Sequence, residues 1–139
     1  MKIHTLTMDN FRAYSGEQRL DLTPKNKSSL ILIDGQNMQG KTSLFMAIRW
    51  CLYGEVKDRL GNIIPIVDFE NIEKGENSLL NKKAFEDENY DISVQIVFEH
   101  EDKIFNLERG AESNGEPTDN KDFKEALSLT IESENEEET

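Results

Sequence analysis

The stretch LILIDGQNMQGKTS, residues 30–43, decides how this chain is expected to fold. Its four leading aliphatic residues predict a strand that is buried on both faces, as in a parallel sheet. Gly35 allows the backbone to turn sharply where that strand ends. From Gly35 onward the sequence fully matches G-x-x-x-x-G-K-[ST], the pattern of a loop that cradles phosphate groups. A strand, a phosphate-binding loop and a helix are therefore expected in succession.

The helix that should follow the loop is expected from Thr42 onward. Apolar residues recur there at the spacing of one helix face: Leu44, Ala47, Ile48, Cys51 and Leu52. Gly54 is the expected C′ residue that ends the helix. A glycine-rich turn that merely precedes a lysine would lack this setting of strand and periodic helix, so the phosphate-binding interpretation is favoured.

The predicted loop gives each of its residue types a role. Backbone N–H groups of the loop and of the helix start have no intrahelical partners, so they can converge on phosphate oxygens. Lys41 is expected to reach the β- and γ-phosphates, and the Thr42 hydroxyl is the expected Mg²⁺ ligand. ATP and Mg²⁺ are the predicted cofactors. The expected binding residues of the loop are Gly35, Gln36, Asn37, Met38, Gln39, Gly40, Lys41, Thr42 and Ser43.

Composition limits the function classes. A length of 139 residues suits one domain with a core. The 16 basic and 28 acidic residues give a net charge of −12, so the surface as a whole should repel nucleic acid and anionic membranes. The lone Cys51 is expected to be a buried structural thiol. Because no signal segment or long apolar run is visible, a cytoplasmic protein without a membrane contact is expected.

Hydrophobic alternation predicts the remaining strands at residues 2–9, 18–22, 90–98, 103–109 and 127–131. The first two should form an antiparallel pair. The next two should form a hairpin that turns at Glu101-Asp102, and the last strand should join that hairpin. The expected fold class is α/β, with a mixed sheet and antiparallel hairpins around the strand–loop–helix unit.

Other segments carry weaker signals. Residues 55–77 contain glycine, proline and many charges, and they are interpreted as a long, partly mobile excursion. Residues 79–85 are expected to form a short helix, and residues 110–122 a loop. The expected domain is residues 1–131, followed by an acidic, disordered tail at residues 132–139.

Taken together, these residues resemble the N-terminal half of the ATPase head of SMC- and Rad50-like proteins, within the ABC ATPase class. The resemblance rests on Asn10-Phe11-Arg12, Tyr14 to Glu17, Ile33 to Asn37, Gly40 to Leu44, Ala47-Ile48 and Leu52 to Gly54, and more loosely on Leu79 to Lys82, Val94 to Phe98 and Ile104 to Arg109. Trp50 to Gly54 and Leu80-Asn81-Lys82 look most like the bacterial ATPases of DNA sulfur modification and their relatives in phage-defence operons.

The resemblance implies specific roles. Asn37 matches an asparagine that reaches toward the γ-phosphate and the attacking water. Arg12 matches an arginine that lies near the bound nucleotide and helps to couple ATP to DNA; without the resemblance it would be taken for a solvated arginine after a strand. Met38 stands where the family usually has glycine, and this bulky residue is expected to alter the loop backbone or its flexibility.

Several parts of such a head have no match in this sequence: the signature segment, the aspartate that holds Mg²⁺ and the catalytic glutamate. Asp68 and Glu99 follow short apolar runs, but the first run is loop-like and the second belongs to the predicted hairpin, so neither is favoured as a metal ligand. His4 and His100 fit no zinc pattern with Cys51. Lys41 and Asn37 would therefore contribute to a catalytic site that is incomplete.

The resemblance also implies partners. A C-terminal lobe of the same or a split protein and a second head that dimerises on ATP binding would complete the site, and DNA would be engaged by the assembled complex. Two alternatives remain open at this point: a self-contained small P-loop kinase or GTPase, and a nucleotide-binding scaffold that does not hydrolyse ATP.

Overall fold

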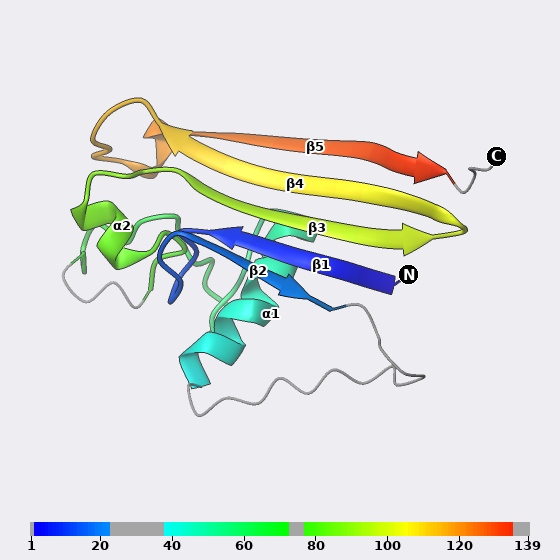
Figure 1. Ribbon diagram of the computed structural model, residues 1–139. Helices are drawn as coiled ribbons and strands as arrows, with labels where there is room; N and C mark the ends of the chain where they lie inside the picture. The colour runs from blue at the N-terminus through cyan, green and yellow to red at the C-terminus, as the bar shows by residue number, and fades with distance from the viewer. Residues whose placement is uncertain (1, 23–37, 73–76, 135–139) are drawn as a thin grey trace.

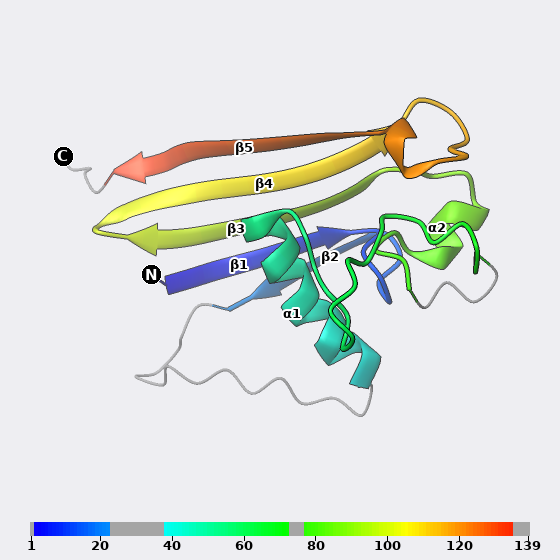
Figure 2. The same ribbon diagram turned by 180° about the vertical axis from the view of Figure 1, so that it is seen from behind.

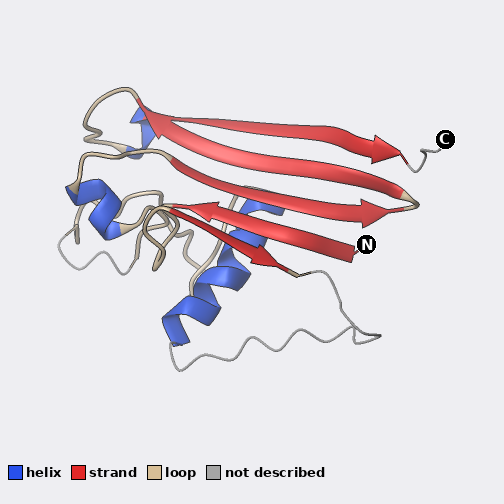
Figure 3. Cartoon of the chain, viewed as in Figure 1, coloured by secondary structure: helices blue, strands red, loops and turns tan. Residues whose placement is uncertain are grey.

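The computed structural model describes residues 2–22, 38–72 and 77–134. In these residues the elements are β1 (Lys2–Asp9), β2 (Glu17–Asp21), α1 (Met38–Tyr53), α2 (Lys82–Glu86), β3 (Ile92–His100), β4 (Lys103–Ser113), the 3₁₀ helix η1 (Asn120–Asp122) and β5 (Phe123–Glu134). The strands form one five-stranded sheet in the order β2-β1-β3-β4-β5, and every neighbouring pair is antiparallel (Figure 3).

The sheet confirms most of the strands predicted from alternation. β1 spans residues 2–9 as expected and pairs with β2, and β3 and β4 form the expected hairpin. Glu101 and Asp102 both have positive φ values, 53° and 66°, in the turn that joins them. β5 pairs with β4 as expected. Every second side chain of a strand points to the same side of the sheet, so the strands at residues 2–9, 92–100 and 103–113 together form one surface.

One prediction about the sheet is not tested, and the end of the sheet differs from another. The five described strands are antiparallel; the parallel strand that would make the sheet mixed, predicted at residues 30–33, lies outside the described residues. β5 continues to Glu134, with Ser133 opposite Ile104, so the strand runs three residues into the segment expected to be a disordered tail. Pairing with β4 satisfies the backbone there, which the acidic composition could not reveal.

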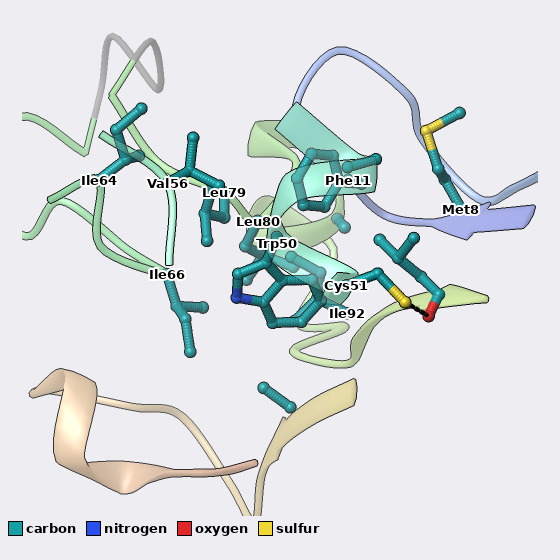
Figure 4. Close-up of a cluster of buried hydrophobic side chains, with 14 of the residues drawn as sticks. Met8, Phe11, Trp50, Cys51, Val56, Ile64, Ile66, Leu79, Leu80 and Ile92 are labelled. Carbon is teal, nitrogen blue, oxygen red and sulfur yellow. Dashed lines mark hydrogen bonds between the residues drawn. The ribbon is translucent and has the colours of Figure 1, made fainter. Parts of the chain in front are cut away.

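α1 lies across one face of the sheet, with β1 and β3 behind it in the view of Figure 2, and β5 lies at the edge farthest from it. The core is between this helix and the sheet. Its largest fully buried side chains are Trp50, Phe11, Leu6, Met8, Leu80, Ile92, Ile96 and Val94. Figure 4 shows Trp50 and Cys51 of α1 among several of these side chains. Trp50 and Phe11 pack with their ring centroids 5.8 Å apart.

The buried face of α1 is turned slightly from the predicted one. Leu44, Ala47 and Cys51 are buried as expected, but Ile48 and Leu52 are only half-buried, and Trp50 is buried in their place. Trp50 lies three residues after Ala47, so it also fits a helical face, and its large apolar surface favours the interior.

The ends of α1 show one difference from the prediction and one agreement. The helix begins at Met38, four residues before the expected start at Thr42. Methionine and glutamine are good helix formers, unlike the glycine usual at position 38, and they favour this earlier start. Gly54 ends the helix as predicted, with a φ of +81° and an N–H that donates to the carbonyl of Trp50 at 2.8 Å.

The segment after α1 is packed rather than mobile in its described residues, which corrects the prediction for residues 55–77. Val56, Ile64, Ile66 and Val67 are all buried in the core. The carbonyls of Pro65 and Ile66 accept hydrogen bonds from the N–H groups of Leu79 and Leu80, both at 3.0 Å. Residues 73–76 lie outside the described part of the chain. Of the predicted helix at residues 79–85, the structure forms only the second half, as α2.

Candidate nucleotide-binding site

The predicted phosphate loop leads into α1. Gly35, Gln36 and Asn37 lie outside the described residues, and of Met38, Gln39, Gly40 and Lys41 only the helical backbone is described. Beyond them Thr42 is exposed and Ser43 is buried, at 1% exposure. The exposed Thr42 side chain can reach a ligand from solvent, whereas Ser43 faces the protein.

A turn of the N-terminal segment lies beside this end of α1. The N–H of Ala13 donates to the Oγ of Ser43 at 3.5 Å, which joins the residue after Arg12 to the helix. Phe11 is fully buried, where it contacts Trp50 of α1 and bridges to Leu80. The core thus holds the Phe11-Arg12 pair next to the helix that follows the predicted loop.

Arg12 itself has an unusual conformation. Its φ of +49° lies in the left-handed region that few non-glycine residues occupy, and Asn10 has a φ of +58°. Such conformations persist where the surrounding contacts impose them. Here the Arg12 N–H donates to the carbonyl of Leu79 at 2.7 Å, and its Nη1 donates to the carbonyl of Ser78 at 3.3 Å. Arg12 is therefore a fixed, half-buried cation and not a fully solvated one.

Burial also affects the chemistry of Arg12. Desolvation lowers the pKa of its guanidinium from the ordinary value. An arginine still keeps its charge at neutral pH, because its ordinary pKa is so high. A partly desolvated cation interacts more strongly with an anion than a fully hydrated one does. A guanidinium in this position is suited to donate hydrogen bonds to a phosphate oxygen.

Asn81 holds the Arg12 turn from the other side. Its Nδ2 donates to the Arg12 carbonyl at 2.7 Å, and its own N–H donates to the carbonyl of Asn10 at 2.8 Å. At the same time its Oδ1 accepts the N–H of Ala84 at 3.0 Å and caps α2. The sequence did carry a signal for the cap, an asparagine directly before a helix, but not for the contact with Arg12, which lies 69 residues away.

Asn10 closes the same turn. Its N–H donates to the carbonyl of Gly16 at 3.1 Å, and its Oδ1 accepts the Gly16 N–H at 2.9 Å. Its Nδ2 donates to the carbonyl of Asp91, the residue before β3. The residue is 2% exposed. Asn10, Ser78 and Asn81 were not predicted as site residues, since a buried amide or hydroxyl between distant segments leaves no local pattern.

Of the other two candidate ligands, Asp68 lies next to a residue that contacts Arg12, and Glu99 lies elsewhere in the sheet. The Asp68 N–H donates to the Oγ of Ser78 at 2.7 Å, and its Oδ1 accepts the Glu70 N–H at 3.2 Å. Glu99 contacts the His4 ring at 3.2 Å on neighbouring strands β3 and β1. Within the described ranges no group of three histidine, cysteine, aspartate or glutamate residues could hold a metal ion.

Cys51 is a structural thiol, as predicted. It is fully buried, and its thiol donates to the carbonyl of Val94 at 3.3 Å. Burial raises its pKa to about 11, which leaves very little nucleophilic thiolate at neutral pH.

The start of α1 fits a phosphate group on two grounds. The first turn of α1 contains no acidic residue, although the chain carries 28 of them, so this turn itself places no carboxylate at the positive end of the helix dipole. The Arg12 turn adds a cation beside this helix. Thr42 and the basic side chains of Lys41 and Arg12 are the groups that would hold a nucleotide and its Mg²⁺, whereas the predicted Ser43 side chain is buried against the Arg12 turn. A bound Mg²⁺ would neutralise phosphate charge.

A family model described as an AAA domain matches residues 5–139 of this chain. The chain belongs to this AAA domain family of SMC- and Rad50-like ATPases. The match covers nearly the whole chain, and the resemblance to an SMC-like ATPase head is confirmed at that level. Members of this family bind nucleotide, typically with Mg²⁺, and typically dimerise.

The chain is similar to Arcadin-4 of Pyrobaculum calidifontis. The two are 36% identical over 69 residues, which cover 48% of this chain. The aligned region is 8% of the length of Arcadin-4, so the chain corresponds to a small part of that protein. In the described ranges no helix is long and apolar enough to cross a bilayer.

Proposed function

We propose that this chain is the ATP-binding N-terminal half of a DNA-associated, SMC/Rad50-like ATPase head. The observation that supports this most directly is the hydrogen bond from the Ala13 N–H to the Oγ of Ser43. It brings the Arg12 turn to the helix that follows the G-x-x-x-x-G-K-T sequence. In this proposal Lys41 binds the β- and γ-phosphates, Thr42 binds Mg²⁺, and Arg12 approaches the nucleotide from the side.

The proposal gives the chain half of a catalytic site. Phosphoryl transfer depends on a positioned metal ion and water, and the sequence supplies Lys41 and Asn37 for this purpose but no matching catalytic glutamate. A C-terminal lobe and a second head would complete the site, and ATP would hold the two heads together. A role in DNA modification, repair or phage defence is part of the proposal and rests on the resemblance of Trp50 to Gly54 and Leu80 to Lys82.

DNA contact is assigned to the assembled complex. With a net charge of −12, the chain should bind duplex DNA feebly, because affinity grows with the number of phosphates that basic residues neutralise. Local contacts, where they exist, would come from Lys25, Lys27, Lys57, Arg59, Lys82 and Lys83.

An arginine substitution tests the proposed site. Arg12→Ala should weaken binding of Mg·ATP by roughly tenfold to a hundredfold, the size expected for a lost hydrogen bond to a charged group. Arg19→Ala is the matched control, because Arg19 is an exposed residue of β2. Calorimetry on the full chain measures both. Equal weakening by the two substitutions, or none by Arg12→Ala, would remove Arg12 from the site.

The rate of ATP hydrolysis by the pure chain distinguishes the proposal from the alternative of a self-contained small P-loop enzyme. The pure chain should hydrolyse ATP at a negligible rate, since its site is incomplete. Sustained hydrolysis that disappears in Lys41→Ala would instead show a self-contained enzyme.

A further inference from the structure

The outer strand β5 presents a row of exposed apolar side chains. Leu127, Leu129 and Ile131 are 52%, 58% and 51% exposed. They alternate along the strand, so they point to the same side of the sheet. β5 is the last strand in the sheet order and pairs with β4 along one edge, which leaves its other edge open in the described structure.

This row continues the face that α1 covers. Leu129 lies opposite Leu107 of β4, and Leu107 packs against the core and lies opposite Ile96, a fully buried residue of β3. α1 reaches as far as β4, where the Cys51 thiol lies 3.6 Å from the Leu107 carbonyl. β5 is the next strand outward, as Figures 1 and 2 both show. The core face thus extends onto β5 without a helix above it.

The usual protection of an edge strand is missing from this part of β5. Proteins commonly guard such edges with lysine, proline or an inward-pointing charge. Residues 126–131, Ala-Leu-Ser-Leu-Thr-Ile, contain none of these, although the chain as a whole carries a charge of −12. A bulge comes next: Ile131 lies opposite Phe105 and Ser133 opposite Ile104, so Glu132 is the extra residue. The uncharged segment therefore ends where the register shifts.

The segment 127–131 is also self-complementary. Read in either direction, it alternates apolar, hydroxyl, apolar, hydroxyl, apolar: Leu127, Ser128, Leu129, Thr130 and Ile131. In an antiparallel pair, residues directly opposite one another share a face. Two copies paired antiparallel about Leu129 would place apolar residues opposite apolar residues and Ser128 opposite Thr130.

We propose that two copies of this chain associate without nucleotide, through antiparallel pairing of their β5 strands about a two-fold axis at Leu129. In this register Leu127 lies opposite Ile131 of the second copy. The pairing satisfies the open backbone edge and sets the apolar rows of the two copies side by side on one face of a continuous sheet. A second copy fits better than an unrelated strand because the segment matches itself. Residues 126–131 are uncharged, so the pairing places no like charges directly opposite one another.

A charge-swap experiment tests the surface. Two double variants of the full chain are made, Leu127→Lys with Ile131→Lys and Leu127→Glu with Ile131→Glu, and each is studied by sedimentation over a concentration series without nucleotide. Like charges then face each other across the two-fold axis, so the dissociation constant of each variant should rise by about tenfold or more. An equimolar mixture places lysine opposite glutamate, and a heterodimer should form.

The control uses exposed apolar residues elsewhere. Leu60 and Ile63, which are 86% and 58% exposed, lie in the segment after α1. The pair Leu60→Lys with Ile63→Lys should leave self-association unchanged. Fluorescence of the buried Trp50 reports whether every variant is folded.

Cysteine cross-linking tests the register. Leu129→Cys should form a disulfide-linked dimer with itself. Leu127→Cys should cross-link efficiently only when it is mixed with Ile131→Cys. The native Cys51 is fully buried and should not interfere.

Three results would overturn the inference. They are a wild-type chain that stays monomeric throughout the concentration series, a dimer that both β5 charge variants leave unchanged, and a dimer lost equally in the control variant. In the first case the exposed row of β5 would belong to a different partner. Because no nucleotide is present, the outcome is independent of ATP binding.

Discussion

Replacement of the buried Asn81 by alanine should destabilise the protein strongly for a single substitution. The side chain is 6% exposed, caps α2 through the Ala84 N–H and donates to the Arg12 carbonyl. Loss of an asparagine N-cap costs about 0.5–2 kcal/mol. Loss of the donor to Arg12 costs about 1–3 kcal/mol when the acceptor is shielded from water. Asn81→Ala should therefore lower the free energy of unfolding by about 1.5–5 kcal/mol.

Urea denaturation followed by tryptophan fluorescence measures this loss. Trp50 is the single tryptophan of the chain and is 1% exposed, so its emission should change sharply on unfolding. Asn81→Asp keeps an oxygen for the Ala84 N–H but loses the donor to Arg12, so it separates the two contributions. Asn62→Ala removes an exposed side chain and is the control, with an expected change within about 0.5 kcal/mol. An Asn81→Ala protein as stable as the control variant would refute the assigned contacts.

Three further predictions concern individual residues of the fold. Gly54→Ala should destabilise the protein more than Gly16→Ala. Both glycines have positive φ, but only at Gly54 would the new Cβ lie 3.1 Å from the Arg109 guanidinium. Urea denaturation compares the two variants, and equal losses of stability would contradict the crowding at Gly54. Cys51 should resist alkylation at pH 8 in the folded protein, because a pKa of about 11 leaves roughly one thiol in a thousand ionised; reaction as fast as in urea would show an accessible thiol. Burial, with Glu17 and Asp91 nearby, raises the pKa of Asp9, so the charged carboxylate lowers the stability above the folded-state pKa and this loss disappears as the carboxylate is protonated. Asp9→Asn should therefore stabilise the protein at pH 7 and lose that advantage in acid. An advantage that is constant at all pH values would disprove the assignment.

The strands could be predicted from sequence because their signal is local. Ile92, Val94 and Ile96 alternate with polar residues, and one face of β3 is buried, so the pattern and the burial agree. The helix α1 was predicted from its period for the same reason. Its exact face was not, because Ile48 and Trp50 both fit a helical stripe and the shape of the core decides between them.

The contacts that hold the Arg12 turn could not be predicted in this way. They join Asn10, Ser78 and Asn81 to residues far along the chain through single hydrogen bonds, which leave no periodic pattern. The segment after α1 was mistaken for a mobile excursion because its buried residues are scattered between glycine, proline and charges. The role of Arg109 was also missed: its Nε donates to the Cys51 carbonyl near the end of α1, where unpaired carbonyls need donors.

Calorimetric titration with Mg·ATP tests the central claim most directly. The full chain, Lys41→Ala and the control Lys57→Ala are compared under the same conditions; Lys57 is an exposed residue after α1. The account predicts that the wild type and Lys57→Ala bind Mg·ATP alike and that Lys41→Ala does not bind it measurably. Equal binding by the wild type and Lys41→Ala would contradict the assignment of residues 35–43 as the phosphate-binding loop.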